Sequence, residues 1–100
     1  MYFAVSKILF DPESSSQLDR KTLHALVDKL RAQFRICVEV SGNVEDTGHA
    51  ELAICALDRT ANRLSQLFDK IVEFCERSEG IRVADDPTII EDVGIVEDEE

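Results

Sequence analysis

The side chains best suited to metal binding or nucleophilic chemistry are three cysteines, Cys37, Cys55 and Cys75, together with His49. Zinc sites typically use close pairs such as C-x2-C or H-x3-H, and these four residues form no such pair. A nucleophilic cysteine needs an adjacent base or a helix N-terminus, whereas Cys75 comes late in a predicted helix and the other two lie in predicted strands. We therefore predict no catalytic residue, no metal site and no cofactor. We interpret the cysteines as free, buried thiols in a reducing cytoplasm.

A second group of side chains could contact phosphates. Four basic residues recur at spacings of 4, 7 and 4 along a predicted helix: Arg20, His24, Arg31 and Arg35. Such a basic stripe is a pattern found in RNA-binding proteins. Asp28 interrupts it, and a helix face in contact with water gives the same pattern. RNA binding through this stripe is one of our alternative hypotheses.

The acidic residues gather at the C-terminal end. The formal net charge is −10, but residues 85–100 hold eight of the 21 acidic residues and no basic one. The rest of the chain is therefore close to neutral. We predict one domain over residues 1–93 and an acidic C-terminal tail over residues 94–100. No apolar run approaches the roughly 20 residues of a membrane-spanning helix, so we expect no membrane partner.

The elements that must position these side chains follow from the periodicity of the apolar residues. We predict a strand over 2–10, a turn in PESSSQ, a helix over 23–34, and strands over 36–41 and 49–57. A second helix begins with Asp58 as its N-cap and ends at Gly80, and a last strand starts at residue 81 and is broken at Pro87. We leave open whether the residues after Pro87 continue that strand.

The order β-α-β-β-α-β predicts an α+β, ferredoxin-like fold with a four-stranded antiparallel sheet and two helices on one of its faces. The other face of such a sheet meets solvent or a partner. We expect Cys37, Glu39, Ala53 and Cys55 to lie on this open face, which makes them candidates for an interaction face, including one that forms a homodimer.

Three segments resemble the YlxP-like family of small bacterial proteins: LRAQFRICVEV at 30–40, AELAICAL at 50–57 and LFDKIVEFCE at 67–76. The resemblance implies a ferredoxin-like fold without an assigned function. It also implies a role near the ribosome, since genes of the family tend to lie among translation genes. The family's glutamate in the second strand corresponds to Glu39. Of the family's basic Leu-Lys-x-Lys-Arg motif, SQLDR retains only Arg20, with Lys21 just beyond it.

Our leading hypothesis is a small cytoplasmic interaction domain without enzymatic activity, associated with translation or ribosome maturation. One alternative is a dimeric regulatory domain that senses a small molecule. The other is a divergent RNA-binding protein that uses the basic stripe.

Overall fold

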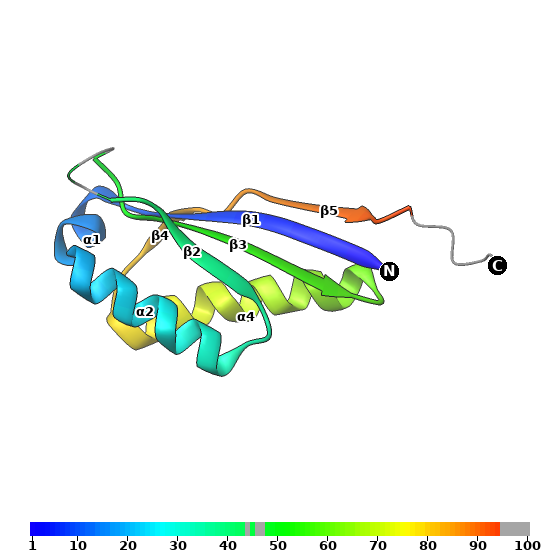
Figure 1. Cartoon of the computed structure of the whole chain (residues 1–100). Coiled ribbons are helices and arrows are strands. Elements are labelled where there is room, and N and C mark those ends of the chain that lie inside the picture. Colours follow the sequence, from blue (N-terminus) through cyan, green and yellow to red (C-terminus); the bar gives the residue numbers. More distant parts are fainter. Residues whose placement is uncertain (44, 46–47, 95–100) are drawn as a thin grey trace.

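The computed structural model describes residues 1–43, 45 and 48–94, and for Glu79 the backbone only. Its elements are β1 (Tyr2–Phe10), α1 (Pro12–Gln17), α2 (Arg20–Gln33), β2 (Cys37–Gly42), β3 (Glu51–Asp58), α4 (Ala61–Glu79), β4 (Val83–Asp85) and β5 (Thr88–Asp92). The sheet has the order β2-β3-β1-β4, with β5 also paired to β1, and every pairing is antiparallel (Figure 1). This is the predicted ferredoxin-like arrangement.

The sheet has five strands rather than the predicted four because the last strand is broken at Pro87. On either side of the break, β4 and β5 pair with the two halves of β1. The carbonyl of Pro87 still accepts a hydrogen bond from the Lys7 amide at 3.1 Å. A proline removes only its own donor, so the edge continues through the break. Residues 88–92 therefore continue the line of the last strand along β1.

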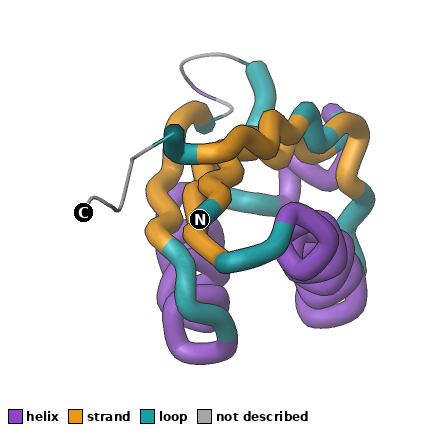
Figure 2. The backbone as a smooth tube through the Cα atoms, turned by 90° about the vertical axis from the view of Figure 1, so that its right-hand side faces the viewer, coloured by secondary structure: helices purple, strands orange, loops and turns teal. Residues whose placement is uncertain are grey.

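The helices gather on one side of the strands (Figure 2). α2 packs against β2, whereas α4 packs against β1, β3, β4 and β5. The buried residues of α2 lie on one side of the helix, at intervals of three, one and three positions: Leu23, Leu26, Val27 and Leu30. Those of α4 recur every three or four positions: Leu64, Phe68, Ile71 and Cys75. The strands meet them with every second residue, including Ala4, Ile8, Phe10, Leu52 and Ile54. One core therefore lies between the helices and one face of the sheet.

The short helix α1 stands where PESSSQ predicted a turn. The carboxylate of Asp11 caps it by accepting from the Ser14 amide at 2.7 Å, and Pro12 follows at the first helical position. The buried hydroxyl of Ser15 donates to the carbonyl of Phe10 at 3.1 Å and accepts from the Ala50 amide at 3.0 Å. α1 thus satisfies buried backbone groups of β1 and of the residue before β3.

The starts of the two longer helices differ from the sequence prediction, and α2 also ends one residue earlier than predicted, at Gln33. α2 begins at Arg20 because Asp19 accepts from the Thr22 amide. The N-cap of α4 is Thr60 and not Asp58, whose carboxylate instead accepts from the amides of Arg59 and Thr60 at the end of β3. Gly80 ends α4 in the left-handed conformation, with φ of 65°, as predicted.

The predicted domain, residues 1–93, includes every helix and strand of the described residues. Of the predicted acidic tail, residues 95–100 lie outside the described residues. Within the described chain, no helix combines the length and the apolar character needed to cross a membrane.

Candidate functional site: the open face of the sheet

The face of the sheet turned away from the helices presents every second residue of four strands. The strand register arranges these side chains in rows. The first row runs Glu91, Phe3, Leu57, and Arg35 continues it two residues before Cys37. The second row runs Ile89, Val5, Cys55, Cys37. The third contains Lys7, Ala53 and Glu39.

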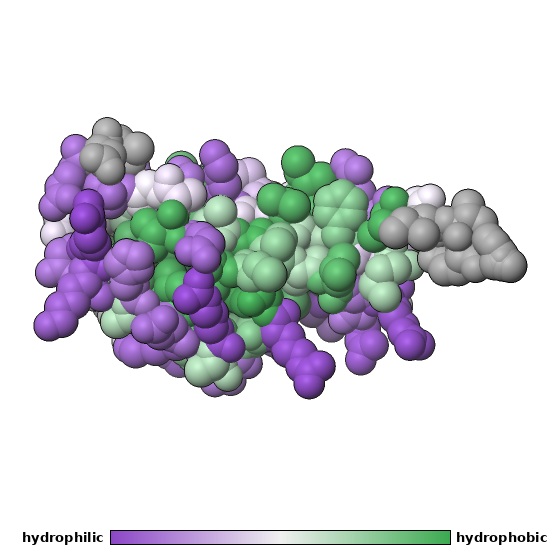
Figure 3. Space-filling view, in the orientation of Figure 1, coloured by the Kyte–Doolittle hydropathy of each residue, from purple (hydrophilic) through white to green (hydrophobic). Residues whose placement is uncertain are grey.

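One end of this face is apolar and exposed. We use the name apolar end for the six side chains Phe3, Val5, Cys37, Cys55, Leu57 and Ile89. Among them Leu57 is 66% exposed, Ile89 59% and Val5 45%. In the space-filling view, hydrophobic side chains reach the helix-free side of the molecule in the half nearer the N-terminus (Figure 3). Contiguous exposed apolar side chains on several strands are typical of a binding surface.

The apolar end also contains a shallow hollow of about 640 Å³. It is lined by Phe3, Val5, Arg35, Ile36, Cys37, Cys55, Ala56 and Leu57. Most of the lining is apolar, and Arg35 is its one charged member. The hollow can accept an apolar group with an acidic group beside it.

The other end of the face is polar, and its charges are paired within the chain. The ammonium group of Lys7 lies 3.7 Å from the carboxylate of Glu51, and the carboxylate of Glu39 lies 2.9 Å from the guanidinium of Arg31. Arg35 and Glu91 differ from these residues. Among the described residues, neither has an ion-pair partner.

The four residues predicted for the open face lie together on it. Cys37 is directly opposite Cys55, and Glu39 is directly opposite Ala53. Their role in an interaction stays a prediction. The sequence reasoning did not include Phe3, Val5 and Ile89, which complete the apolar end. The two-residue period of the strand predicted over 2–10 places Phe3 and Val5 on one face, and this period was the signal that could have identified them.

The prediction of three buried thiols is wrong for two of them. Cys75, a residue of α4, is buried, but Cys37 and Cys55 are exposed. Their strands bury alternate residues, and both cysteines fall on the uncovered alternation. Desolvation raises the pKa of the Cys55 thiol above its usual value, and a hydrogen bond to Cys37 raises it further. The two residues are direct neighbours across the pairing of β2 with β3.

The predicted basic stripe is not continuous. Arg35 lies beyond the end of α2, in the connection to β2, and lines the hollow on the open face. The helix ends at Gln33 because Phe34 turns to extended backbone and packs its ring edge-on against Phe74. Of the remaining stripe residues, Arg20 and His24 are exposed, and Arg20 lies 3.7 Å from the acidic Glu45.

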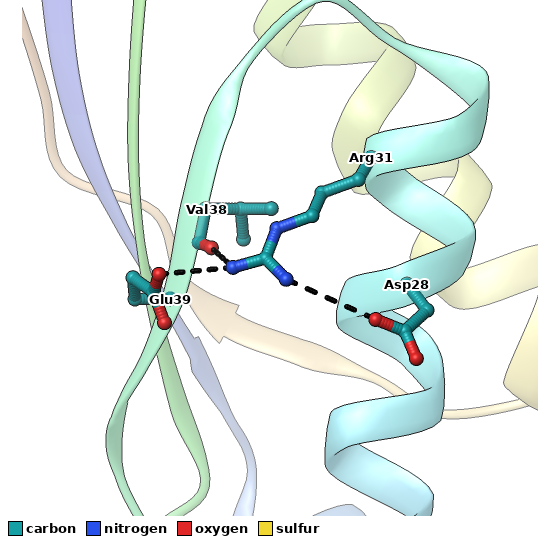
Figure 4. A network of polar contacts seen from close by, with 4 residues as sticks. All are labelled: Asp28, Arg31, Val38 and Glu39. Carbon is teal, nitrogen blue, oxygen red and sulfur yellow. Dashed lines mark hydrogen bonds and ion pairs between the residues drawn. The ribbon is translucent and has the colours of Figure 1, made fainter.

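Arg31, the third stripe residue on the helix, forms a clasp between α2 and β2. Its guanidinium donates to the carbonyl of Val38 at 2.8 Å and to the carboxylate of Glu39 at 2.9 Å, and it lies 3.8 Å from Asp28 (Figure 4). A guanidinium engaged in this way offers few free donors to a phosphate. The RNA-binding hypothesis thus loses two of its four contacts.

Metal-binding residues do not converge in the described part of the chain. Across those residues, no group of three or more histidine, cysteine, aspartate or glutamate side chains lies close enough to hold an ion. His49 is exposed in the segment before β3, far along the strand from Cys55.

Comparisons with known proteins identify the family and support the fold. A family model described as a protein of unknown function, DUF503, matches residues 13–86, and the chain belongs to that family. No curated protein sequence matches the chain significantly. Among solved structures, the chain is similar to the crystal structure of a "putative antibiotic biosynthesis monooxygenase" from Deinococcus radiodurans. The TM-score is 0.51 at 15% identity, over 100% of this chain and 99% of that one. This likeness concerns the fold alone.

Proposed function

We propose that this member of the DUF503 family is an interaction domain that pairs with a second copy of itself through the open face of its sheet. The observation that carries the proposal is the exposure of Val5, Leu57 and Ile89 side by side on three strands. Burying apolar area stabilises an association by about 25 cal/mol per Å² before the costs of association. These side chains gain nothing from the helices, which cover the opposite face.

Two charges that have no ion-pair partner among the described residues, those of Arg35 and Glu91, favour a second copy as the occupant. Arg35 and Glu91 stand at opposite edges of the same row, with Phe3 and Leu57 between them. A two-fold axis parallel to the strands, between β1 and β3, places each copy's Arg35 over the other copy's Glu91. The same axis places Val5 over Cys55 and Cys37 over Ile89. A two-fold interface must be complementary to itself, and this row meets that condition.

A binding role is favoured over catalysis by the composition of the apolar end. Apart from the two thiols, its side chains carry no acid, base or nucleophile: Phe3, Val5, Leu57 and Ile89. Packed sheets lie about 10 Å apart with their strands near −30° to each other, and side chains fill the space between. The long side chains of Arg35 and Glu91 can adjust to that angle at the edges of the interface.

The association can be tested by sedimentation velocity over a range of protein concentrations. We expect the natural chain to form dimers and Leu57→Lys to be monomeric, because the substitution places a charge in the centre of the interface. Ala25→Lys adds the same charge on an exposed position of α2 and should leave the dimer intact. A natural chain that stays monomeric at the highest concentration overturns the proposal. An equal loss of dimer in both variants does so too.

We further propose that this domain acts near translation. The support is the resemblance of its core segments to YlxP-like proteins. Co-sedimentation with ribosomes through a sucrose cushion tests it: we expect the chain in the ribosomal pellet at low salt and less of it at high salt. If the chain stays in the supernatant at low salt, the proposed role near translation is wrong.

The hollow at the apolar end favours a second candidate, a domain that senses a small molecule. Its volume of about 640 Å³ falls in the range of ligand pockets, roughly 300–1,000 Å³. A ligand at about 100 times its dissociation constant would stabilise the fold by about 2.7 kcal/mol. A thermal-shift screen with apolar carboxylates would then raise the melting temperature of the natural chain but not that of Leu57→Lys. Equal shifts in both proteins would exclude this hollow as the binding site.

A further inference from the structure

Cys37 and Cys55 are neighbours across two strands and point away from the core. They are directly opposite each other in the β2–β3 register, and both are exposed. Cys37 is the first residue of β2, which forms one edge of the sheet, whereas Cys55 lies in β3 between two other strands. The third cysteine, Cys75, is buried on α4 and takes no part in the pair.

The direction of the backbone groups fixes the kind of pair that these residues form. The Lys7 amide donates to Pro87, so the backbone groups of Lys7 face away from β3. In an antiparallel ladder, two residues opposite each other direct their backbone N–H and C=O groups either both toward each other or both away from each other. These two kinds of pair alternate along the strand. Ala53, the register partner of Lys7, therefore directs its backbone groups toward β2, and Cys55 does the same two residues later.

The other strand gives the same answer. The carbonyl of Val38 accepts from Arg31 on α2 and so points away from β3, which leaves its neighbour Cys37 facing β3. Cys37 and Cys55 are thus a hydrogen-bonded pair of the ladder, with Cα atoms about 5.5 Å apart. Disulfides span Cα separations of about 4.4–6.8 Å. The backbone spacing permits a direct S–S bond.

Such a bond would be under strain. The Cβ atoms of opposite residues lie about 4.5–5.5 Å apart and are further apart in hydrogen-bonded pairs, whereas a disulfide needs about 3.5–4.5 Å. Closing that gap requires a small shift of one strand. Cys37 can supply it, because β2 is an edge strand and Cys37 is its first residue. Exposed or strained disulfides are easily reduced and are typical of regulation rather than of structural support.

We propose that Cys37 and Cys55 form a reversible dithiol–disulfide pair, oxidised by exchange with a small disulfide such as glutathione disulfide. The Cys37 thiolate attacks one sulfur of glutathione disulfide, forming a mixed disulfide and releasing one glutathione thiolate. Cys55 then loses its proton and attacks the sulfur of Cys37, releasing the second glutathione. Two protein thiols are oxidised, and one glutathione disulfide is reduced to two thiols.

The roles of the two cysteines follow from their places in the sheet. Cys37 lies at the edge, where a small disulfide can approach it. Cys55 stays protonated more readily because partial desolvation and the neighbouring Cys37 raise the pKa of its thiol. It is therefore suited to the second step, which takes place within the chain and at high effective concentration. The pair lies in the proposed dimer interface, so that we expect exchange in the free subunit and slower exchange in the dimer.

The test uses the full chain, reduced and then diluted until it is monomeric, so that the result does not depend on dimer formation. After incubation with glutathione disulfide, free thiols are alkylated and the intact mass and peptide map are measured. We expect the natural chain to lose two hydrogens, with Cys37 and Cys55 joined and Cys75 alkylated after unfolding. Reduced glutathione should restore both thiols.

Single variants separate the two steps. Cys55→Ser should retain one glutathione on Cys37, because the second step is missing, and Cys37→Ser should acquire less glutathione in the same time. A natural chain that accumulates a stable glutathione adduct, or that stays fully reduced, overturns the proposal. A Cys37–Cys55 disulfide that reduced glutathione does not open overturns its reversibility.

Discussion

The two faces of this sheet are made from alternate residues of the same strands, yet their exposures differ sharply. On β3, Leu52 is fully buried beneath the helices, whereas Leu57 is 66% exposed on the open face. On β1, Ile8 is fully buried and Val5 is 45% exposed. The covered face is mostly apolar, and its buried polar residue on β1, Ser6, accepts a hydrogen bond from the Thr88 hydroxyl at 2.9 Å. The open face is apolar at one end only and has internally paired charges at the other.

This difference separates the residues that stabilise the fold from those available to a partner. The fold needs the covered face, because two amphipathic helices and one sheet face bury each other there. It does not need Phe3, Val5, Leu57 and Ile89 to be apolar, since the helices never reach them. The proposed association with a second copy would account for their common position between Arg35 and Glu91, which have no ion-pair partner among the described residues.

The strongest test of the comparison is the same substitution on each face of β3. Leu52→Ala should lower the free energy of unfolding by about 2–5 kcal/mol, because it removes buried contacts and leaves a cavity. Leu57→Ala should change the free energy of unfolding of the monomer by less than about 0.5 kcal/mol. Urea denaturation of both variants at low protein concentration measures this. Similar losses in the two variants would contradict the division of the faces.

The next effect concerns the end of the covered face, where Ser15 bridges two backbone segments. Ser15→Ala should cost about 1–3 kcal/mol, because it leaves the buried Ala50 amide without its acceptor. Ser16→Ala is the matched control: its hydroxyl is exposed and donates only to the Glu13 carbonyl. Chemical denaturation measures the free energy of unfolding of both variants. A loss of stability in Ser16→Ala as large as that in Ser15→Ala would contradict the stabilising role of the Ser15 hydrogen bonds.

A smaller effect belongs to the clasp that joins the helix layer to the open face. A double-mutant cycle on Arg31 and Glu39 should give a coupling of roughly 0.2–1 kcal/mol that weakens with salt, because both side chains are substantially exposed. The exposed pair Arg77–Glu73 on α4 is the control, with an expected coupling of about 0.3–0.5 kcal/mol. A coupling between Arg31 and Glu39 that does not change with salt would contradict the exposure of this ion pair in the structure.

The smallest effect is on acid stability. Hydrogen bonds from the amides of Ser14 and Thr22 lower the pKa values of Asp11 and Asp19, respectively, below the ordinary 3.8. A lowered pKa stabilises the folded state above the unfolded-state value and loses that contribution as the pH falls. Asp19→Asn keeps the acceptor but not the charge. The stability difference between the natural chain and Asp19→Asn should therefore shrink below about pH 3.8 in urea titrations. A difference that stays constant across that pH would contradict the cap assignment.

Most of the fold could be predicted from the sequence because it depends on periodicity. The change from helical to alternating spacing around Arg35 marks the passage from α2 to β2, and Gly80 marks the end of α4. The choice between neighbouring N-cap residues, and between a turn and a short helix, was harder to predict. Asp58 and Thr60 are both good N-caps, and only the length of β3 decides between them. PESSSQ has the composition of a turn, but its buried hydroxyls hold it as a helix against the sheet.

The candidate site was predicted in part. The alternation of residues along a strand shows which side chains share a face of the sheet, but it does not show which residues of neighbouring strands lie opposite each other. Cys37, Glu39, Ala53 and Cys55 were assigned to the correct face. The position of Cys37 directly opposite Cys55 depends on the register of β2 against β3, including its irregularity between Val40 and Gly42. Ile89 belongs to the apolar end only because β5 pairs with β1 beyond Pro87. The sequence analysis did not decide whether the strand continues there.

The measurement that tests the proposed dimer most directly is a charge exchange between Arg35 and Glu91, followed by sedimentation equilibrium. Arg35→Glu and Glu91→Arg should each abolish the dimer, because each places like charges opposite one another twice across the two-fold axis. The double variant restores opposite charges and should recover a dimer close to that of the natural chain. Single variants that dimerise as well as the natural chain, or a double variant that stays monomeric, would contradict the proposed pairing of the open faces.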